Sequence, residues 1–125
     1  HYQVGQALAV LRTENILIIG SGNIVHNLRQ YDWSGRAAGS RAWAARFEQQ
    51  AKELILADDH AALINYKNLG SDAILSIPTP EHYLPLLYVL GSKAPEDVIR
   101  FPVEGIEGGS VSMLAVELSG SQGHD

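Results

Sequence analysis

The chain has 125 residues, of which 46% are hydrophobic, so it can form the core of one domain or of part of a larger one. Its formal net charge of -5 argues against nucleic acid and against an anionic membrane as partners. Cysteine is absent, which excludes disulfides and thiolate chemistry, so any metal must be held by histidine, aspartate or glutamate.

The amino-terminal residues predict a helix followed by a buried strand. Residues 2–13 place Val4, Leu8 and Leu11 on one apolar face, as in an amphipathic helix. Residues 16–19 then form a continuous apolar run in which three residues are β-branched. Such a run is typical of a strand that is buried on both faces of a parallel sheet. We therefore expect an α/β fold with a mainly parallel central sheet flanked by helices.

The turn at residues 20–23, Gly-Ser-Gly-Asn, follows this strand and leads to His26. Ligands of open α/β sheets bind beyond the carboxyl ends of strands, so His26 stands where chemistry is expected. The turn does not fit a dinucleotide-binding loop, because Val25 occupies the position where that fingerprint has glycine or alanine. It also lacks the Gly-x-Ser-x-Gly pattern of a serine nucleophile.

Residues 27–66 predict a loop and two helices. Residues 27–39 have no clean period and predict the loop, whereas the apolar spacing of residues 41–57 predicts a long amphipathic helix. Glu48 and Lys52 are expected to form an i,i+4 pair on the solvent side of that helix. A shorter helix should follow an aspartate cap and reach about Tyr66, with an exposed His60 in its first turn.

A second histidine adjoins another apolar segment. Residues 84–90 are almost entirely apolar and predict a buried helix that ends at Gly91. Pro85 is tolerated only in the first turn, so the helix should begin at or just after Glu81. His82 then lies at the positive end of the helix, where the dipole favours the neutral imidazole that binds metals.

The carboxyl-terminal residues predict two strands, residues 98–103 and 110–118. Residues 104–109 contain three glycines and should join them as a hairpin. Residues 119–125 are a polar tail.

His26 and His82 are the candidates for chemistry. Two histidines do not complete a metal site, which needs at least three protein ligands for zinc or non-haem iron. A carboxylate could be added by one of three glutamates that the spacing does not choose between: Glu81, Glu104 and Glu107.

Three blocks of the sequence resemble the class III extradiol ring-cleavage dioxygenases, in the branch named for 4,5-DOPA dioxygenase. The blocks are residues 21–29, 78–88 and 102–113. They follow the order of the family, and the resemblance covers essentially all 125 residues. Family members are longer and carry two further metal-binding histidines in amino-terminal Gly-His-Gly-Ser-Pro-like and Ser-Ala-His-Trp-like segments. Neither segment occurs here, so we expect residues 1–125 to be the carboxyl-terminal half of such a catalytic domain.

The resemblance implies a role for each histidine. His82 corresponds to a metal ligand, and His26 corresponds to an acid/base beside the metal that in this branch also contacts it. The implied cofactor is a divalent metal, Fe(II) or Zn(II), and the implied reaction is cleavage of a DOPA-like catechol by dioxygen. The implied macromolecular partner is the missing amino-terminal half, which carries the other metal ligands.

Two other functions remain open on the sequence. The chain could be a catalytically incompetent fragment or interaction module, or part of a zinc-dependent hydrolase that uses the same histidines. Every metal-centred hypothesis requires the two imidazole rings to lie within about 10 Å of each other. Sheet edges left open by a missing half should make the chain self-associate as a homo-oligomer. No apolar run approaches the roughly 20 residues of a membrane span, and no signal peptide is visible, so we expect a cytoplasmic protein.

Overall fold

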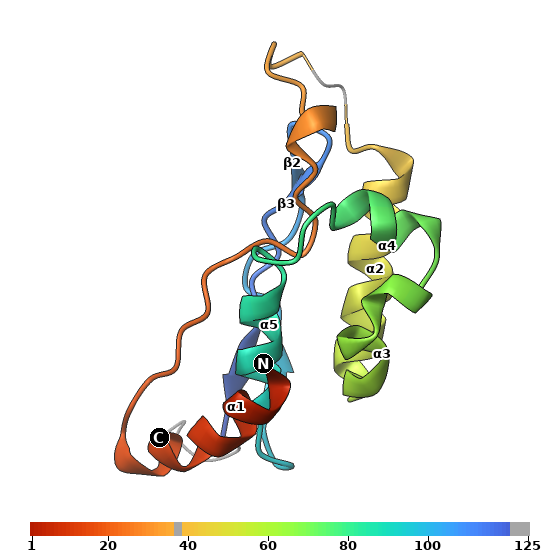
Figure 1. Ribbon diagram of the computed structural model, residues 1–125. Helices are drawn as coiled ribbons and strands as arrows, with labels where there is room; N and C mark the ends of the chain where they lie inside the picture. The colour runs from red at the N-terminus through yellow and green to blue at the C-terminus, as the bar shows by residue number, and fades with distance from the viewer. Residues whose placement is uncertain (37–38, 121–125) are drawn as a thin grey trace.

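Helices and short strands make up the described residues, 1–36 and 39–120, in the computed structural model (Figure 1). The helical elements are α1 (Tyr2–Leu8), η1 (Ala9–Glu14), η2 (Leu28–Gln30), α2 (Ala42–Leu56), α3 (His60–Ile64), η3 (Tyr66–Asn68), α4 (Ser71–Ser76) and α5 (Leu84–Gly91). The strands are β1 (Val98–Arg100), β2 (Ile106–Glu107), β3 (Val111–Ser112) and β4 (Glu117–Ser119). None of the helices in these ranges has the length and apolarity that crossing a bilayer demands. Residues 121–125 of the polar tail lie outside the described residues.

The elements form two groups (Figure 1). Helices α2, α3 and α4 pack together on one side, and α1, α5 and the strands lie on the other. Helices α1 and α5 approach closely because each has a glycine at the contact. A Cβ atom on Gly5 would overlap the carbonyl of Tyr88, and one on Gly91 would overlap the carbonyl of Tyr2. Glycine lowers the intrinsic stability of α1, but it allows these two helix backbones to meet.

The core joins the two groups through α2 and the turn before α5. The predicted long helix is confirmed as α2, and its Phe47, Ala51 and Ile55 are completely buried. Tyr83, at the start of α5, is also completely buried, and its hydroxyl donates a 2.6 Å hydrogen bond to the carbonyl of Leu63 in α3. This burial raises the pKa of the Tyr83 hydroxyl well above its ordinary value.

The predicted pair between Glu48 and Lys52 is wrong. Lys52 pairs instead with Glu104, and the carboxylate of Glu48 accepts a 2.6 Å hydrogen bond from the hydroxyl of Ser112. The reason is that this side of α2 faces the hairpin of β2 and β3 rather than solvent. Tertiary partners therefore replace the local partner that the i,i+4 spacing suggested.

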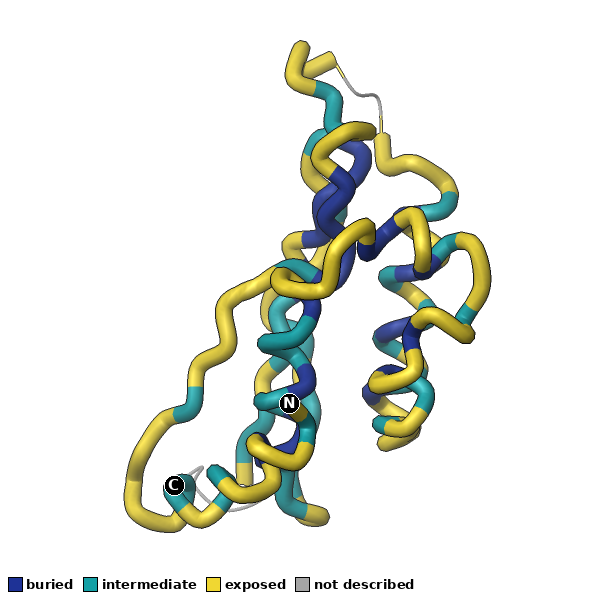
Figure 2. Tube along the Cα trace, in the orientation of Figure 1, coloured by how far each residue is buried: buried dark blue, intermediate teal, exposed yellow. Residues whose placement is uncertain are grey.

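The buried strand predicted at residues 16–19 is also wrong for this chain. The segment is extended but belongs to no sheet, and Leu17 and Ile19 are 81% and 78% exposed. Figure 2 shows this region as a mostly exposed, extended segment that stands away from α5. Within the described ranges, the backbone N–H groups of residues 17–22 find no hydrogen-bond partner. A strand with two buried faces needs neighbours on both sides, and the described residues supply none here.

The strands that do pair are antiparallel, so the mainly parallel sheet of the sequence analysis is not formed by the described residues. β1 pairs with β4, and β2 pairs with β3. Backbone bonds from Met113 to Gly105 and from Ala115 to Val103 join the two ladders into one long ribbon. Residues 101–105 on one strand lie opposite residues 113–116 on the other, so the ribbon contains a bulge. The predicted carboxyl-terminal hairpin is therefore confirmed.

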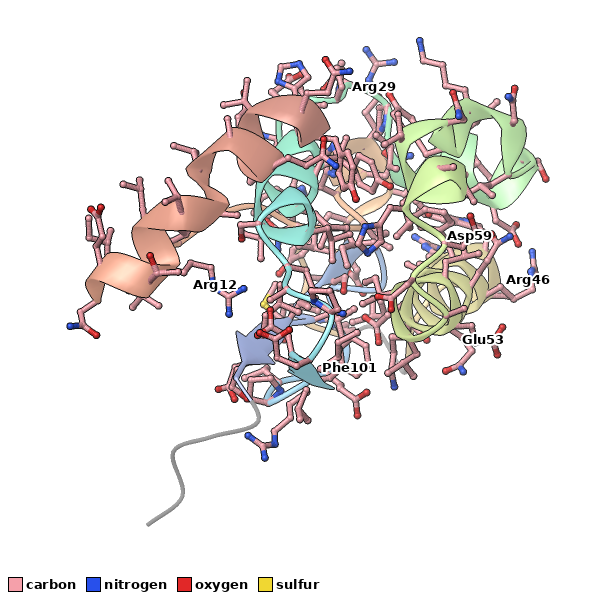
Figure 3. The ribbon with its side chains drawn as sticks, turned by 90° about the horizontal axis from the view of Figure 1, so that it is seen from below. Arg12, Arg29, Arg46, Glu53, Asp59 and Phe101 are labelled. Carbon is pink, nitrogen blue, oxygen red and sulfur yellow. The ribbon has the colours of Figure 1, made fainter. Side chains whose placement is uncertain are left out.

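Two arginine–aspartate pairs fasten outer elements, and Figure 3 labels their arginines, Arg12 and Arg46. Arg12 of η1 binds Asp97 through both terminal nitrogens at 2.5 and 2.9 Å, and Arg46 of α2 binds Asp72 of α4 at 2.7 and 2.8 Å. The Asp97 side chain is only 2% exposed, so Arg12 is the group that compensates a buried charge. The exposed Arg46 pair contributes much less to stability.

His60 is half-buried, against the prediction of an exposed position at the start of a helix. Its side chain is 13% exposed, and its Nδ1 lies 2.6 Å from the hydroxyl of Tyr2 in α1. Asp58 lies 3.6 Å from the other ring nitrogen and is itself 3.4 Å from Lys93. Residues that are 58 positions apart in the chain create this environment, so local sequence could not reveal it.

We expect the protein to lose stability as the pH falls from about 7 to about 5. Burial lowers the pKa of His60, and Lys93 lowers it further, while Asp58 and Asp59 oppose the shift. The unfolded chain therefore binds a proton below about pH 6.5 that the folded chain resists, and protonation favours unfolding. Urea unfolding should show this slope, and His60→Gln should reduce it. An equal slope in both proteins would assign the pH dependence to other groups.

Candidate active site around two histidines

His26 is held by backbone pairing at the end of the extended segment. It forms an isolated antiparallel bridge with Val111, and its backbone N–H donates a 2.9 Å bond to the carbonyl of Ser76. The neighbouring Val25 is completely buried, and His26 itself is 7% exposed. The β-branched residue thus anchors the histidine between the ribbon and the end of α4.

His82 lies in the turn that precedes α5. The carbonyl of Pro80 accepts the backbone N–H groups of Tyr83 and Leu84 at 2.8 and 2.9 Å, which closes this turn. The helix begins at Leu84, slightly later than predicted, so His82 precedes it rather than occupying its first turn. His82 is exposed, and no hydrogen bond holds its ring within the described parts of the chain.

The two imidazole rings meet, although they are far apart in the sequence. Their centroids lie 5.1 Å apart with an angle of 58° between the ring planes. This distance is well within the limit of about 10 Å that a shared metal centre requires. Glu81 is the one candidate glutamate beside the histidines, and hydrogen bonds from its own backbone and from Thr79 lower its pKa.

Both ring nitrogens of His26 face carbonyl oxygens. Nδ1 lies 3.0 Å from the carbonyl of Asn23, and Nε2 lies 2.7 Å from the carbonyl of Thr79. A neutral imidazole has one N–H, so only a doubly protonated ring can donate to both oxygens. In the neutral ring one nitrogen donates to its carbonyl and the other keeps a lone pair. The two carbonyls therefore fix the orientation of the ring, and its neutral form can accept a proton.

Asn23 connects the parts of the site, and the sequence analysis did not single it out. Its backbone N–H donates to the carbonyl of His82 at 2.8 Å, and its carbonyl faces the ring of His26. Its side-chain amide donates a 2.7 Å bond to the carbonyl of Ser112 in β3. The available signal was an asparagine at the end of a glycine-rich turn, a residue type that commonly bonds nearby backbone.

A groove of about 380 Å³ opens beside His82. Residues 19–24 form one wall and residues 113–116 form the other. The floor is the face of α5 that carries Pro85, Leu86 and Val89. The lining is mainly apolar, and His82 stands at its edge as a polar group.

The described residues do not complete a metal site. No group of three histidine, aspartate or glutamate side chains stands close enough to hold an ion anywhere in ranges 1–36 and 39–120. Glu104 pairs with Lys52, and Glu107 belongs to β2. The described residues therefore bring two histidines together without a third metal-ligating side chain beside them.

Known proteins include relatives of which this chain matches only a part. No protein-family model matches the chain. A protein of Escherichia coli K12 named 4,5-DOPA dioxygenase extradiol is 45% identical over 122 residues, covering 94% of this chain and 44% of that protein. A Beta vulgaris protein with the same name is 30% identical over 112 residues, covering 90% of this chain and 41% of that protein.

One solved structure shares the fold. It is the crystal structure of an uncharacterized Escherichia coli K12 protein, with a TM-score of 0.84 and 46% identity. The match covers 93% of this chain and 48% of that chain. The chain thus spans less than half the length of each relative described.

Substitution of Gly22 by alanine should disturb the site, because the new Cβ atom would overlap the carbonyl of His82. We expect a loss of about 1–3 kcal/mol in the free energy of unfolding, since both backbones must shift. Gly39→Ala is the matched control, because no described atom lies within 4 Å of its Cβ position. Urea unfolding should separate the two variants, and NMR should show the ring signals of His82 moving only in Gly22→Ala. Equal behaviour would rule out a close approach at Gly22.

Proposed function

Because this chain is homologous to the carboxyl-terminal half of the extradiol dioxygenases named 4,5-DOPA dioxygenase, we propose that it supplies half of a metal-dependent dioxygenase active site. The reaction would be extradiol cleavage of a DOPA-like catechol by dioxygen. The observation that carries the proposal is the meeting of His26 and His82 with their rings 5.1 Å apart. These two residues stand in the blocks on which the family resemblance rests.

His82 is the proposed metal ligand of this chain. Its ring is exposed, lies at the edge of the groove and is not engaged in a hydrogen bond by the described residues. A neutral imidazole suits either Fe(II) or Zn(II), so the donor type fits both proposed metals. When bound, such a metal would bring the two oxygens of the diol and the dioxygen molecule to one centre.

His26 is the proposed acid/base. Imidazole accepts and returns protons near neutral pH, and a positioned group of this kind contributes 10²- to 10⁴-fold to typical rates, as an order of magnitude. The carbonyls of Asn23 and Thr79 orient the ring, and in the neutral imidazole one of its two nitrogens has a lone pair that can accept a proton. His26 would take the phenolic proton of the diol and return a proton as the ring opens. The alternative role of His26 is that of a second metal ligand.

The chain by itself is proposed to be inactive, because the described residues contribute two histidines and no group of three ligands. The other ligands would come from an amino-terminal half. Its small-molecule partners would be an aromatic diol and dioxygen, and the cytoplasmic location stays a prediction.

The function can be tested in a chimera that joins the amino-terminal part of the Escherichia coli relative to this chain. Loaded with Fe(II) without oxygen, the chimera should then consume dioxygen with DOPA and give a yellow product. This chain alone should bind the metal weakly and without fixed stoichiometry. Hydrolysis without dioxygen uptake would instead support the zinc hydrolase, and failure of both reactions would support the incompetent module.

The roles of the two histidines should separate in the same chimera. His82→Ala should lower metal content and turnover together, because it removes a proposed ligand. His26→Ala should lower turnover by about 10²-fold or more while the metal content stays near that of the parent. Metal analysis beside an oxygen electrode measures both quantities. Equal metal loss in the two variants would identify His26 as a ligand.

A further inference from the structure

The groove beside His82 lies between two stretches of backbone that have free edges. On one side, the N–H groups of residues 17–22 have no partner among the described residues. On the other side, Met113 and Ala115 donate to residues 105 and 103, so their bonds point away from the groove. Antiparallel strands alternate the direction of these bonds, so the backbone groups of the intervening Leu114 and Val116 face the other way, toward the groove. Of these groups, the Leu114 N–H is already bonded to the Ser112 hydroxyl at 3.1 Å.

The two walls begin as paired strands and then separate. Asn27 donates to Ser110 at 3.1 Å, and Ser112 donates to Val25 at 2.9 Å, which is the pairing expected of an antiparallel ladder. Beyond this point the ladder stops, and residues 19–24 and 113–116 become opposite walls of the groove over α5. A sheet position is thus open between two strands of the same layer, with a helix already covering one face.

The segment that leads into the first wall, residues 16–19, has the side chains of a buried strand. Residues 16–19 read Ile-Leu-Ile-Ile, yet Ile16, Leu17 and Ile19 are 45%, 81% and 78% exposed. Adjacent large apolar side chains and free strand edges are both signs of a surface that is covered in the working molecule. The mismatch between sequence and exposure therefore marks this groove as an interface.

We propose that the groove receives an extended strand from the amino-terminal half of the enzyme. The lengths indicate the occupant, because the match takes in 94% of this chain but only 44% of the Escherichia coli relative. This inference rests on the proposed function only in taking the occupant from the same kind of enzyme. Since the two walls run in opposite directions, one inserted strand is parallel to one wall and antiparallel to the other.

The inserted strand runs parallel to residues 16–20. The side chains of residues 16–19 are apolar on both faces, which is typical of a strand with a parallel neighbour. The carboxyl ends of parallel strands lie at the same edge of a sheet. The residues that follow the inserted strand would then arrive beside the turn at 20–23, next to His82 and His26. Docking in the groove and delivery of the remaining ligands would be a single event.

The test is binding of the separate amino-terminal part of the Escherichia coli relative to this chain. Light scattering should show a complex of one copy of each, and hydrogen exchange should slow at least about 10-fold at the amides of residues 17–22. Leu17→Lys should weaken the complex about 10-fold or more, because it places a charge in the apolar interface. Leu56→Lys is the matched control, since Leu56 is 57% exposed and lies on α2 rather than on the segment that leads into the first wall.

Several outcomes would overturn the docking inference. They are a complex without protection of residues 17–22, equal weakening by the two lysine variants, and a homo-oligomer of this chain that protects these amides and persists with the added half. If the separate half does not fold, the chimera provides the same comparison. Its residues 17–22 should exchange more slowly than in this chain alone, and Leu17→Lys should lower its melting temperature more than Leu56→Lys.

These outcomes are distinguishable from failure of the proposed function. A protected complex that consumes no dioxygen would retain the docking and remove the dioxygenase assignment. An active complex in which residues 17–22 are not protected would retain the dioxygenase assignment and remove the docking inference.

Discussion

The close approach of the turn at residues 20–23 to the start of α5 is the constraint on which the site depends. The bond from the Asn23 N–H to the His82 carbonyl fixes that approach, and Gly22 leaves room for it. The carbonyl of the same asparagine orients the His26 ring, and its side-chain amide donates a hydrogen bond to the Ser112 carbonyl in β3. Because one residue holds three elements, the two rings are brought together by backbone contacts rather than by side-chain packing alone.

Local patterns in the sequence identified the elements that depend on local interactions. The apolar spacing of α2, the Asp59 side chain that caps α3 and the glycine-rich carboxyl-terminal hairpin were all readable in this way. Ser71–Ser76 form α4, a helix that the sequence analysis did not assign. The meeting of His26 and His82 followed from the family resemblance, since nothing in their spacing places one ring beside the other.

What the sequence could not supply were partners from distant residues. His60 is half-buried, and its ring is bonded to the hydroxyl of Tyr2 in α1, 58 positions away. Residues 16–19 have the composition of an interior strand, but composition cannot say whether a neighbour is present in the same chain. The role of Asn23 likewise arises from bonds to residues 82 and 112, which no local pattern encodes.

The burial of Tyr83 has a consequence for how motion is distributed in the molecule. Its hydroxyl bond to α3 fastens the turn carrying His82 to the helical group with the best-covered core. Residues 17–22 lack such fastenings, so opening fluctuations should concentrate there at little energetic cost. The imidazole of His82 therefore lies on the more rigid side of the groove, and the backbone of residues 17–22 on the other side can adjust around it.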